Sequence, residues 1–145
     1  MGMGLNPTVK EYIDAYTNEE LVSSAFYLKQ VFSTSKTKML VNFNNLTVKY
    51  LPELRQIKIK ISLSNEEYAK YKYNPKVLSY DVYGTTELWF LILEANELHS
   101  VSEFNFRTIY LFRTDIVEKM TRILNLELDS KNYNEEEIST ELLSN

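Results

Sequence analysis

The stretch that most constrains the fold is residues 74–96, which reads as two helices separated by a glycine. Asn74 suits a helix N-cap, and Pro75 suits the first helical position, where its missing N–H leaves no hydrogen bond unmade. Gly84 can adopt the left-handed conformation that ends a helix, and either of the two threonines that follow can cap the next helix. The pattern predicts two short helices held at a fixed angle, which is typical of a docking element rather than an active site.

The second of these helices is apolar on nearly every side. Its run from Leu88 to Leu93 holds the single tryptophan of the chain. A helix that is apolar most of the way round is either buried on several sides or meets a partner. We therefore expect a protein–protein interface here, although each side chain could equally belong to the core. The expected interface residues are Tyr83, Gly84, Leu88, Trp89, Phe90, Leu91 and Ile92.

Helices and strands surround this helix–glycine–helix stretch. Residues 11–32 follow a helical stripe that restarts near Thr17, where the spacing to Glu20 fits a capping box. Isoleucines alternate with lysines in residues 56–63, which is typical of a strand with one buried face. The remaining expected elements are strands at 39–43 and 46–51, a helix capped by Ser64, a capped turn at Ser100, a strand at 108–112 and a helix from Thr114 to about Glu127.

These elements predict a single α+β domain over residues 1–128. It comprises an N-terminal helix, a small antiparallel sheet, the helix–glycine–helix module and a C-terminal helix. Residues 129–145 carry five acidic side chains and one lysine, so this acidic tail accounts for the formal net charge of −4. The tail is either a solvated segment or a small helix that folds on a partner.

The residues that most enzyme sites need are scarce. The chain has no cysteine, one histidine (His99) and three glycines, which argues against thiolate metal sites, nucleophilic triads and phosphate-binding loops. Adjacent carboxylates such as Glu66 and Glu67 point apart on a helix and do not form an acid–base pair. We therefore expect no enzyme activity, no metal and no cofactor.

The charge pattern also bears on partners. Residues 1–128 carry as many basic as acidic side chains, which gives no electrostatic footprint for nucleic acid. Five lysines lie near several tyrosines, and we interpret them as solvent-facing rather than as a single-strand binding site: Lys58, Lys60, Lys70, Lys72 and Lys76. No apolar run approaches the length needed to span a bilayer, so we expect no membrane partner.

The same stretch resembles baseplate wedge proteins of contractile-tailed bacteriophages. Those proteins carry a proline, a short helix, a Tyr-Gly pair, an aromatic-rich helix and a closing asparagine. The matching positions here are Pro75, Leu78, Tyr83, Gly84, Leu88, Trp89, Leu91, Leu93 and Asn96. The resemblance covers about 25 residues well and implies a virion structural protein.

Residues 73–112 also look like a LysM module. In that pattern a strand precedes a Gly-Asp-Thr-Leu-Trp motif, a helix ending in asparagine, a second helix and a closing strand. Residues 80–89 and on to Asn96, then residues 100–105, then residues 108–112 follow that order. Glu87 departs from the motif, and the loop contacts that bind peptidoglycan are not convincingly supplied.

The resemblance to wedge proteins implies a non-enzymatic baseplate wedge or tail-end component that acts through protein–protein interfaces. Its partners would be other baseplate or tail proteins, with several copies in each virion after synthesis in the host cytoplasm. One alternative is a LysM-type module that binds peptidoglycan. Another is a phage accessory protein whose acidic tail inhibits a host target.

Overall fold

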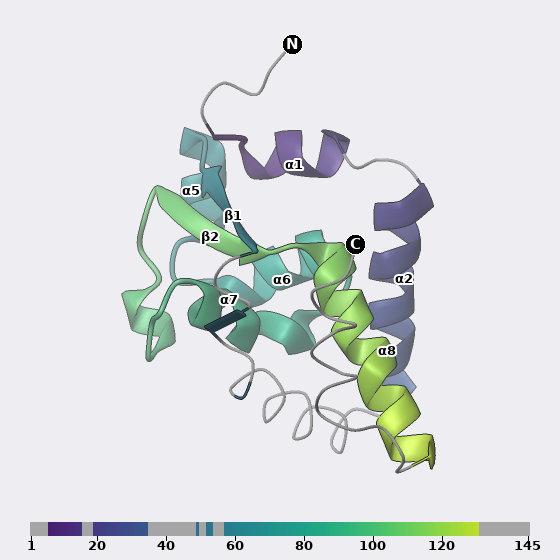
Figure 1. Cartoon of the computed structure of the whole chain (residues 1–145). Helices are drawn as coiled ribbons and strands as arrows, with labels where there is room; N and C mark the ends of the chain where they lie inside the picture. The colour runs from purple at the N-terminus through teal and green to yellow at the C-terminus, as the bar shows by residue number, and fades with distance from the viewer. Residues whose placement is uncertain (1–5, 16–18, 35–48, 50–51, 54–56, 131–145) are drawn as a thin grey trace.

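The computed structural model describes residues 6–15, 19–34, 49, 52–53 and 57–130, with only the backbone described at 19–21, 33–34 and 125–130. Helices and a two-stranded antiparallel sheet make up this part of the chain, so the predicted α+β class is confirmed (Figure 1). The elements in chain order are α1 (Val9–Ala15), α2 (Glu19–Thr34), β1 (Lys58–Ser62), α5 (Asn65–Tyr71), α6 (Pro75–Tyr83), the 3-10 turn η1 (Thr86–Leu88), α7 (Trp89–Ala95), the 3-10 turn η2 (Val101–Glu103), β2 (Thr108–Phe112) and α8 (Thr114–Ser130).

The sheet joins two strands that are far apart in the sequence. Strand β1 pairs with β2 so that Lys60 lies opposite Tyr110 and Ile61 opposite Ile109. Ile61 is fully buried while Lys60 is exposed, which confirms the predicted alternation. The N-terminal segment docks beside β1, because the Ser62 N–H donates to the Pro7 carbonyl at 2.8 Å. Helices α5, α6 and α7 lie in the segment that connects β1 to β2, so the pairing of these two strands brings the two ends of that segment together.

The predicted helix–glycine–helix unit is confirmed. Helix α6 begins at Pro75 and ends at Gly84, whose φ of 79° is left-handed, and Thr85 caps η1 by accepting from the Glu87 N–H. A Cβ placed on Gly84 would lie 2.7 Å from the Ala25 carbonyl oxygen of α2. Glycine is thus required twice, for the backbone conformation and for the close approach of α2.

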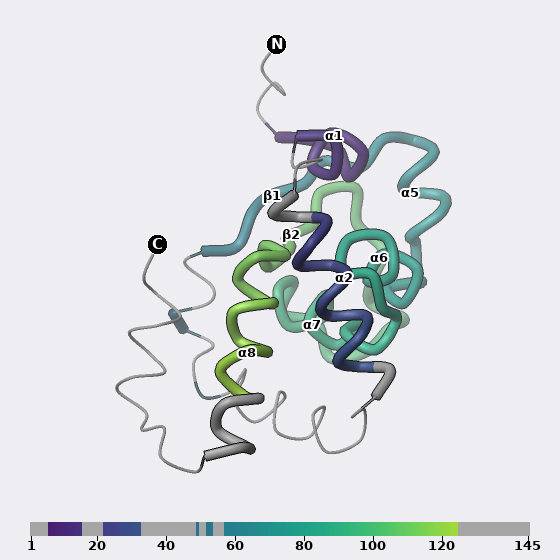
Figure 2. Tube along the Cα trace, turned by 90° about the vertical axis from the view of Figure 1, so that its right-hand side faces the viewer, coloured from purple at the N-terminus to yellow at the C-terminus, as the bar shows by residue number. Residues whose placement is uncertain are grey.

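Two long helices cover one side of this unit. Figure 2 shows α2 between α8 and α6, and it contacts both. The inward side chains Leu28 and Phe32 of α2 are buried. On α8 the predicted apolar stripe is buried along its described length, at Ile116, Val117, Met120, Ile123 and Leu124. Packing of these amphipathic faces encloses the core between the helix pair and the sheet.

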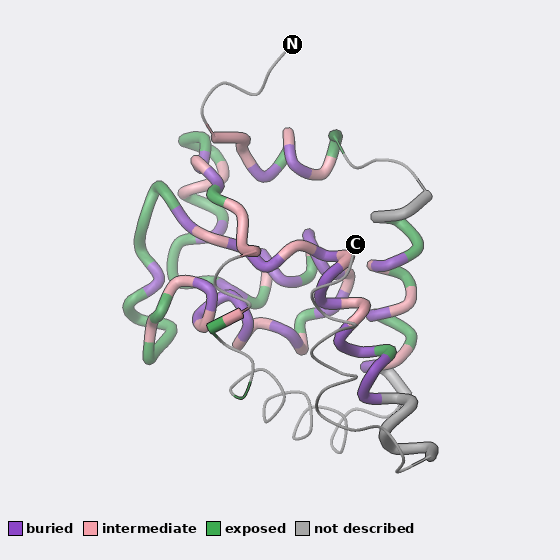
Figure 3. Tube along the Cα trace, viewed as in Figure 1, coloured by how far each residue is buried: buried purple, intermediate pink, exposed green. Residues whose placement is uncertain are grey.

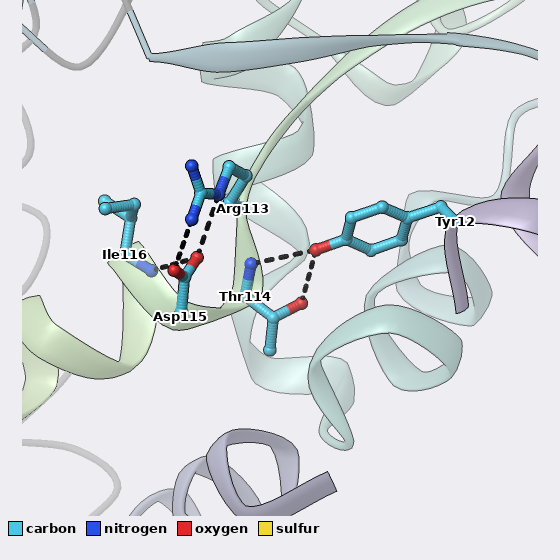
Figure 4. A network of polar contacts seen from close by, with 5 residues as sticks. All are labelled: Tyr12, Arg113, Thr114, Asp115 and Ile116. Atoms are coloured by element: carbon cyan, nitrogen blue, oxygen red, sulfur yellow. Dashed lines mark hydrogen bonds and ion pairs between the residues drawn. The ribbon is translucent and has the colours of Figure 1, made fainter. Parts of the chain in front are cut away.

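A buried polar network fixes the start of α8 (Figure 4). The Tyr12 hydroxyl accepts from the Thr114 N–H at 3.1 Å and lies 3.0 Å from Thr114 Oγ1. Thr114 Oγ1 donates to the Val82 carbonyl, so the Tyr12 hydroxyl donates to Thr114 Oγ1 in turn. On the neighbouring turn Asp115 accepts from Arg113 and from the Ile116 N–H. The network ties α1, α6 and α8 together through paired groups rather than through apolar contact alone.

Some predicted elements differ from the structure or lie outside the described residues. The expected strand at 39–43 and the capping box at Thr17 fall outside them, as do residues 131–145 of the acidic tail. Lys49 is helical, so the strand predicted over 46–51 is wrong at that position. Strand propensity depends on a neighbour to pair with, and short apolar runs do not separate strand from helix.

The LysM-like order also needs a correction. Residues 80–83 precede Gly84, where the LysM pattern has its first strand, but here they form the last turn of α6. The physical reason is local: Pro75 starts a helix that Gly84 ends, which leaves no extended segment between them. A strand does precede the helices, but it is β1, and β2 closes the unit by pairing with it.

Candidate functional site

Most of the residues expected at an interface lie in the core instead. Tyr83, Leu88, Leu91 and Ile92 are fully buried. Gly84, Trp89 and Phe90 are half-buried, and the two aromatic rings pack against the same core. In Figure 3 the backbone of α7 is largely in the buried class. The expectation of excess apolar surface on this helix is therefore not met.

The burial of α7 has a structural reason. The helix contacts α6, η1 and β2, so neighbours within the same chain cover it on several sides. Trp89 keeps one partner at the surface, because the Lys76 ammonium lies 5.8 Å from the centroid of its ring. An apolar helix surrounded in this way needs no second protein.

Asn96 connects the end of α7 to strand β2. Its side-chain N–H groups donate to the carbonyls of Ile92 at 2.7 Å and of Tyr110 at 2.9 Å. Its side-chain oxygen accepts from the Tyr110 N–H at 2.8 Å. The amide thus pairs with the backbone of β2 as a neighbouring strand residue would. The closing asparagine of the motif therefore has a structural role and satisfies the edge of the sheet away from β1.

Aromatic and basic side chains gather instead where α5 ends and β2 begins. This aromatic–cationic surface consists of Tyr68, Lys72, Tyr73, Phe106 and Arg107. Tyr73 is 48% and Phe106 50% exposed, values that are high for aromatic side chains. Figure 3 shows that the segment leading into β2 lies mainly in the exposed class.

Two cations share the ring of Tyr68. The Arg107 guanidinium carbon lies 4.5 Å and the Lys72 ammonium 5.5 Å from its centroid. Arg107 also donates to the side-chain oxygen of Asn65 at 2.7 Å, and the Tyr68 hydroxyl donates to that of Asn105 at 2.5 Å. Lys72 lies 5.4 Å from the Tyr73 ring as well. These contacts order the surface across three segments of the chain.

The backbone of Tyr73 is held in an unusual conformation. Its φ is +58°, in the left-handed region that aromatic residues rarely adopt. Its N–H donates to the Phe104 carbonyl at 2.7 Å, which ties it to the segment that precedes Phe106. A strained, pinned residue with an exposed aromatic side chain is a feature that clusters at binding surfaces.

Two acidic side chains near this surface, Glu67 and Asp81, are engaged elsewhere. Glu67 accepts from the N–H groups of Val9, Lys10 and Ser64. Asp81 pairs with Lys70 at 2.9 Å and accepts from the Tyr71 hydroxyl at 2.7 Å. Within the described residues, Lys72 and Arg107 therefore have rings and an amide as partners rather than carboxylates. The surface presents positive charge that the fold does not neutralise.

Helix α2 exposes a second apolar face. Val22 and Phe26 lie one helical turn apart and are 62% and 68% exposed. The opposite face of the same helix carries the buried Leu28 and Phe32. This outward α2 face and the aromatic–cationic surface lie on different elements. The described part of the chain therefore exposes apolar side chains on two separate surfaces.

The titratable groups with shifted pKa values have structural explanations. Burial, followed by the hydrogen bond to Asp81, raises the pKa of the Tyr71 hydroxyl. Burial also raises the pKa of Tyr83, whose hydroxyl donates to the Phe112 carbonyl at 2.6 Å. N–H donors from His99 and Ser100 lower the pKa of Glu103, which closes the predicted capping box of η2. Each of these three shifts is explained by packing or capping.

The described residues carry neither a candidate metal site nor a candidate membrane span. Among the described residues, no three His, Cys, Asp or Glu side chains are placed to hold a metal ion together. None of the helices found there combines the length and apolar character that a membrane crossing requires. His99 is exposed at the turn before η2.

The sequence did not single out the aromatic–cationic surface. Lys72 is one of the five lysines that we interpret as solvent-facing, and Phe106 and Arg107 give no signal of their own in the sequence. The surface exists because the pairing of β1 with β2 brings residues 105–107 next to α5. A helical spacing of Tyr68 and Lys72 was the one sign available in advance.

Comparison with known proteins gives no relative. No family model, no curated protein and no solved structure matches this chain.

Proposed function

We propose that this chain is a non-enzymatic structural protein of a contractile phage tail, a baseplate wedge or tail-end component that acts through protein–protein interfaces. The observation that carries the proposal is the aromatic–cationic surface, on which Tyr73 and Phe106 are exposed on a backbone pinned by hydrogen bonds. Exposed aromatic residues on an ordered backbone suit an interface, because little side-chain freedom is lost on binding.

The outward α2 face supports the same proposal. Val22 and Phe26 lie on an ordered helix whose other face is anchored in the core. A standard interface buries about 800 Å² on each partner, and two separate faces allow contact with two neighbours. A component built into a larger assembly needs contacts of this kind. The resemblance of residues 74–96 to wedge proteins supports the choice of assembly.

The proposal is tested by co-expressing the full chain with the tail proteins encoded beside its gene. Size-exclusion chromatography should show a stable complex, because both faces would be covered. Phe26→Ser and Phe106→Ser should each reduce the yield of complex without unfolding the chain. Val101→Ser, which changes an exposed apolar residue outside both faces, is the matched control and should leave the complex intact. A chain that stays monomeric beside these proteins would contradict the proposal.

A second candidate is a LysM-type module that binds peptidoglycan. The observation in its favour is the order of elements, in which helices ending at Asn96 are enclosed by β1 and β2 of one antiparallel sheet. Sedimentation with purified peptidoglycan separates the two candidates. Saturable retention of the chain would favour the module, whereas a chain left in the supernatant would exclude it.

A further inference from the structure

From the charge and the exposed rings of the aromatic–cationic surface, we infer that it docks an acidic segment of a partner protein that also carries apolar side chains. The inference deepens the proposed function and rests on it for the nature of the partner. Its evidence, however, comes from the surface alone.

The first step concerns charge. Lys72 and Arg107 approach the ring of Tyr68, and neither has a carboxylate partner within the described residues. Lys76, on the first turn of the next helix, likewise lies over a ring, that of Trp89. A partner segment with carboxylates would supply the missing counter-charges, and arginine in particular binds carboxylates in a bidentate manner.

The second step concerns the apolar part of the surface. Tyr73 and Phe106 expose about half of their side chains, and the Lys72 ammonium lies 5.4 Å from the centroid of the Tyr73 ring. Burial of aromatic rings contributes most when apolar side chains cover them. A purely acidic chain would leave these rings in water, so the fitting segment carries leucine-like residues among its carboxylates.

The third step concerns order. The Tyr68 hydroxyl is bonded to Asn105, Arg107 to Asn65, and the Tyr73 N–H to the Phe104 carbonyl. The surface therefore holds its shape before a partner arrives, which lowers the entropic cost of docking. Nucleic acid is the competing ligand for basic and aromatic residues, but the balanced charge of residues 1–128 gives it no wider footprint.

The test measures fluorescence anisotropy of a labelled peptide of repeated Glu-Glu-Leu as the full chain is added. We expect saturable binding that weakens at least about tenfold in a Lys72→Glu/Arg107→Glu variant, because attraction becomes repulsion. A Lys72→Ala/Arg107→Ala variant should also weaken peptide binding. This variant replaces the charge reversal in the test if the charge reversal disturbs folding. The matched control is Lys29→Glu, which reverses an exposed lysine on α2 and should bind nearly as the parent does.

Several outcomes would overturn the inference. One is that the Glu-Glu-Leu peptide shows no binding, or that its binding is unchanged in both double variants. Another is that a repeated Gln-Gln-Leu peptide binds as tightly as the Glu-Glu-Leu peptide, or that single-stranded oligothymidylate binds more tightly than it. Self-association of the chain that the charge reversal abolishes would assign the surface to a second copy instead. A chain that joins a tail complex despite the charge reversal refutes this inference and leaves the proposed function standing. Peptide binding without any tail complex would support this inference and contradict the proposed function.

Discussion

The helix–glycine–helix unit and the aromatic–cationic surface lie close together in the chain, yet they use aromatic side chains in opposite ways. In the first, Tyr83 is fully buried and its hydroxyl is bonded to a backbone carbonyl. In the second, Tyr73 and Phe106 remain half exposed, and Tyr73 lies beside Lys72. The most apolar stretch of the chain is therefore core, and the surface open to a partner comes from a less conspicuous stretch.

The apolar content of a segment and its exposure to a partner are therefore separate properties. Helix α7 is apolar on nearly every side, but α6, η1 and β2 cover it. The residues at 105–107 carry one large apolar side chain, which the entry into β2 leaves exposed. What decides between the two fates is the number of neighbours that the fold brings to each segment.

The largest effect on stability is expected from truncating a core residue of α7. Leu91→Ala should lower the free energy of unfolding by about 3 kcal/mol, because it opens a cavity at a fully buried site. Urea denaturation followed by circular dichroism measures the change. A loss below about 1 kcal/mol would mean that α7 is not the packed core that its burial indicates.

The next effect concerns Asn96. Asn96→Ala removes three hydrogen bonds and leaves both backbone groups of Tyr110 without this partner. We expect a loss of about 2 kcal/mol in the free energy of unfolding. Hydrogen exchange at the Tyr110 N–H should also accelerate. Asn105→Ala, at an exposed asparagine, is the control. If it lowered the free energy of unfolding as much as Asn96→Ala does, Asn96 would have no special role.

A smaller effect is expected at alkaline pH. Burial raises the pKa of Tyr83 above its ordinary value of 10.0, so above pH 10 the unfolded chain releases a proton that the folded chain keeps. The free energy of unfolding should therefore fall as pH rises above 10, and Tyr83→Phe should flatten that fall. Urea denaturation at neutral pH and in steps above pH 10 measures both slopes. Tyr80→Phe, at an exposed tyrosine, should keep the slope of the parent.

The smallest effect on stability is expected on the aromatic–cationic surface. Phe106→Ala should change the free energy of unfolding by less than about 0.5 kcal/mol, because half of this side chain is already in water. The same variant should clearly weaken binding of the Glu-Glu-Leu peptide. Denaturation and anisotropy on one preparation give both values. A large stability loss with unchanged binding would reverse the roles assigned to the two regions.

The sequence alone determined the local structure well. Ser64 and Glu67 form the expected capping box, Pro75 and Gly84 bound α6, and strand β2 spans residues 108–112 as predicted. These features depend on neighbours within a few residues, through caps, turn conformations and side-chain periodicity. The α+β class followed from the same signals.

Only the tertiary structure decided which apolar residues are buried and which are open. It placed Leu88, Leu91 and Ile92 inside, against elements that the sequence could not position around them. It also brought Arg107 over Tyr68, residues separated by the whole helical connection between β1 and β2. Contacts of this kind arise from chain segments distant in sequence, so periodicity and capping rules, which act over a few residues, carry no information about them.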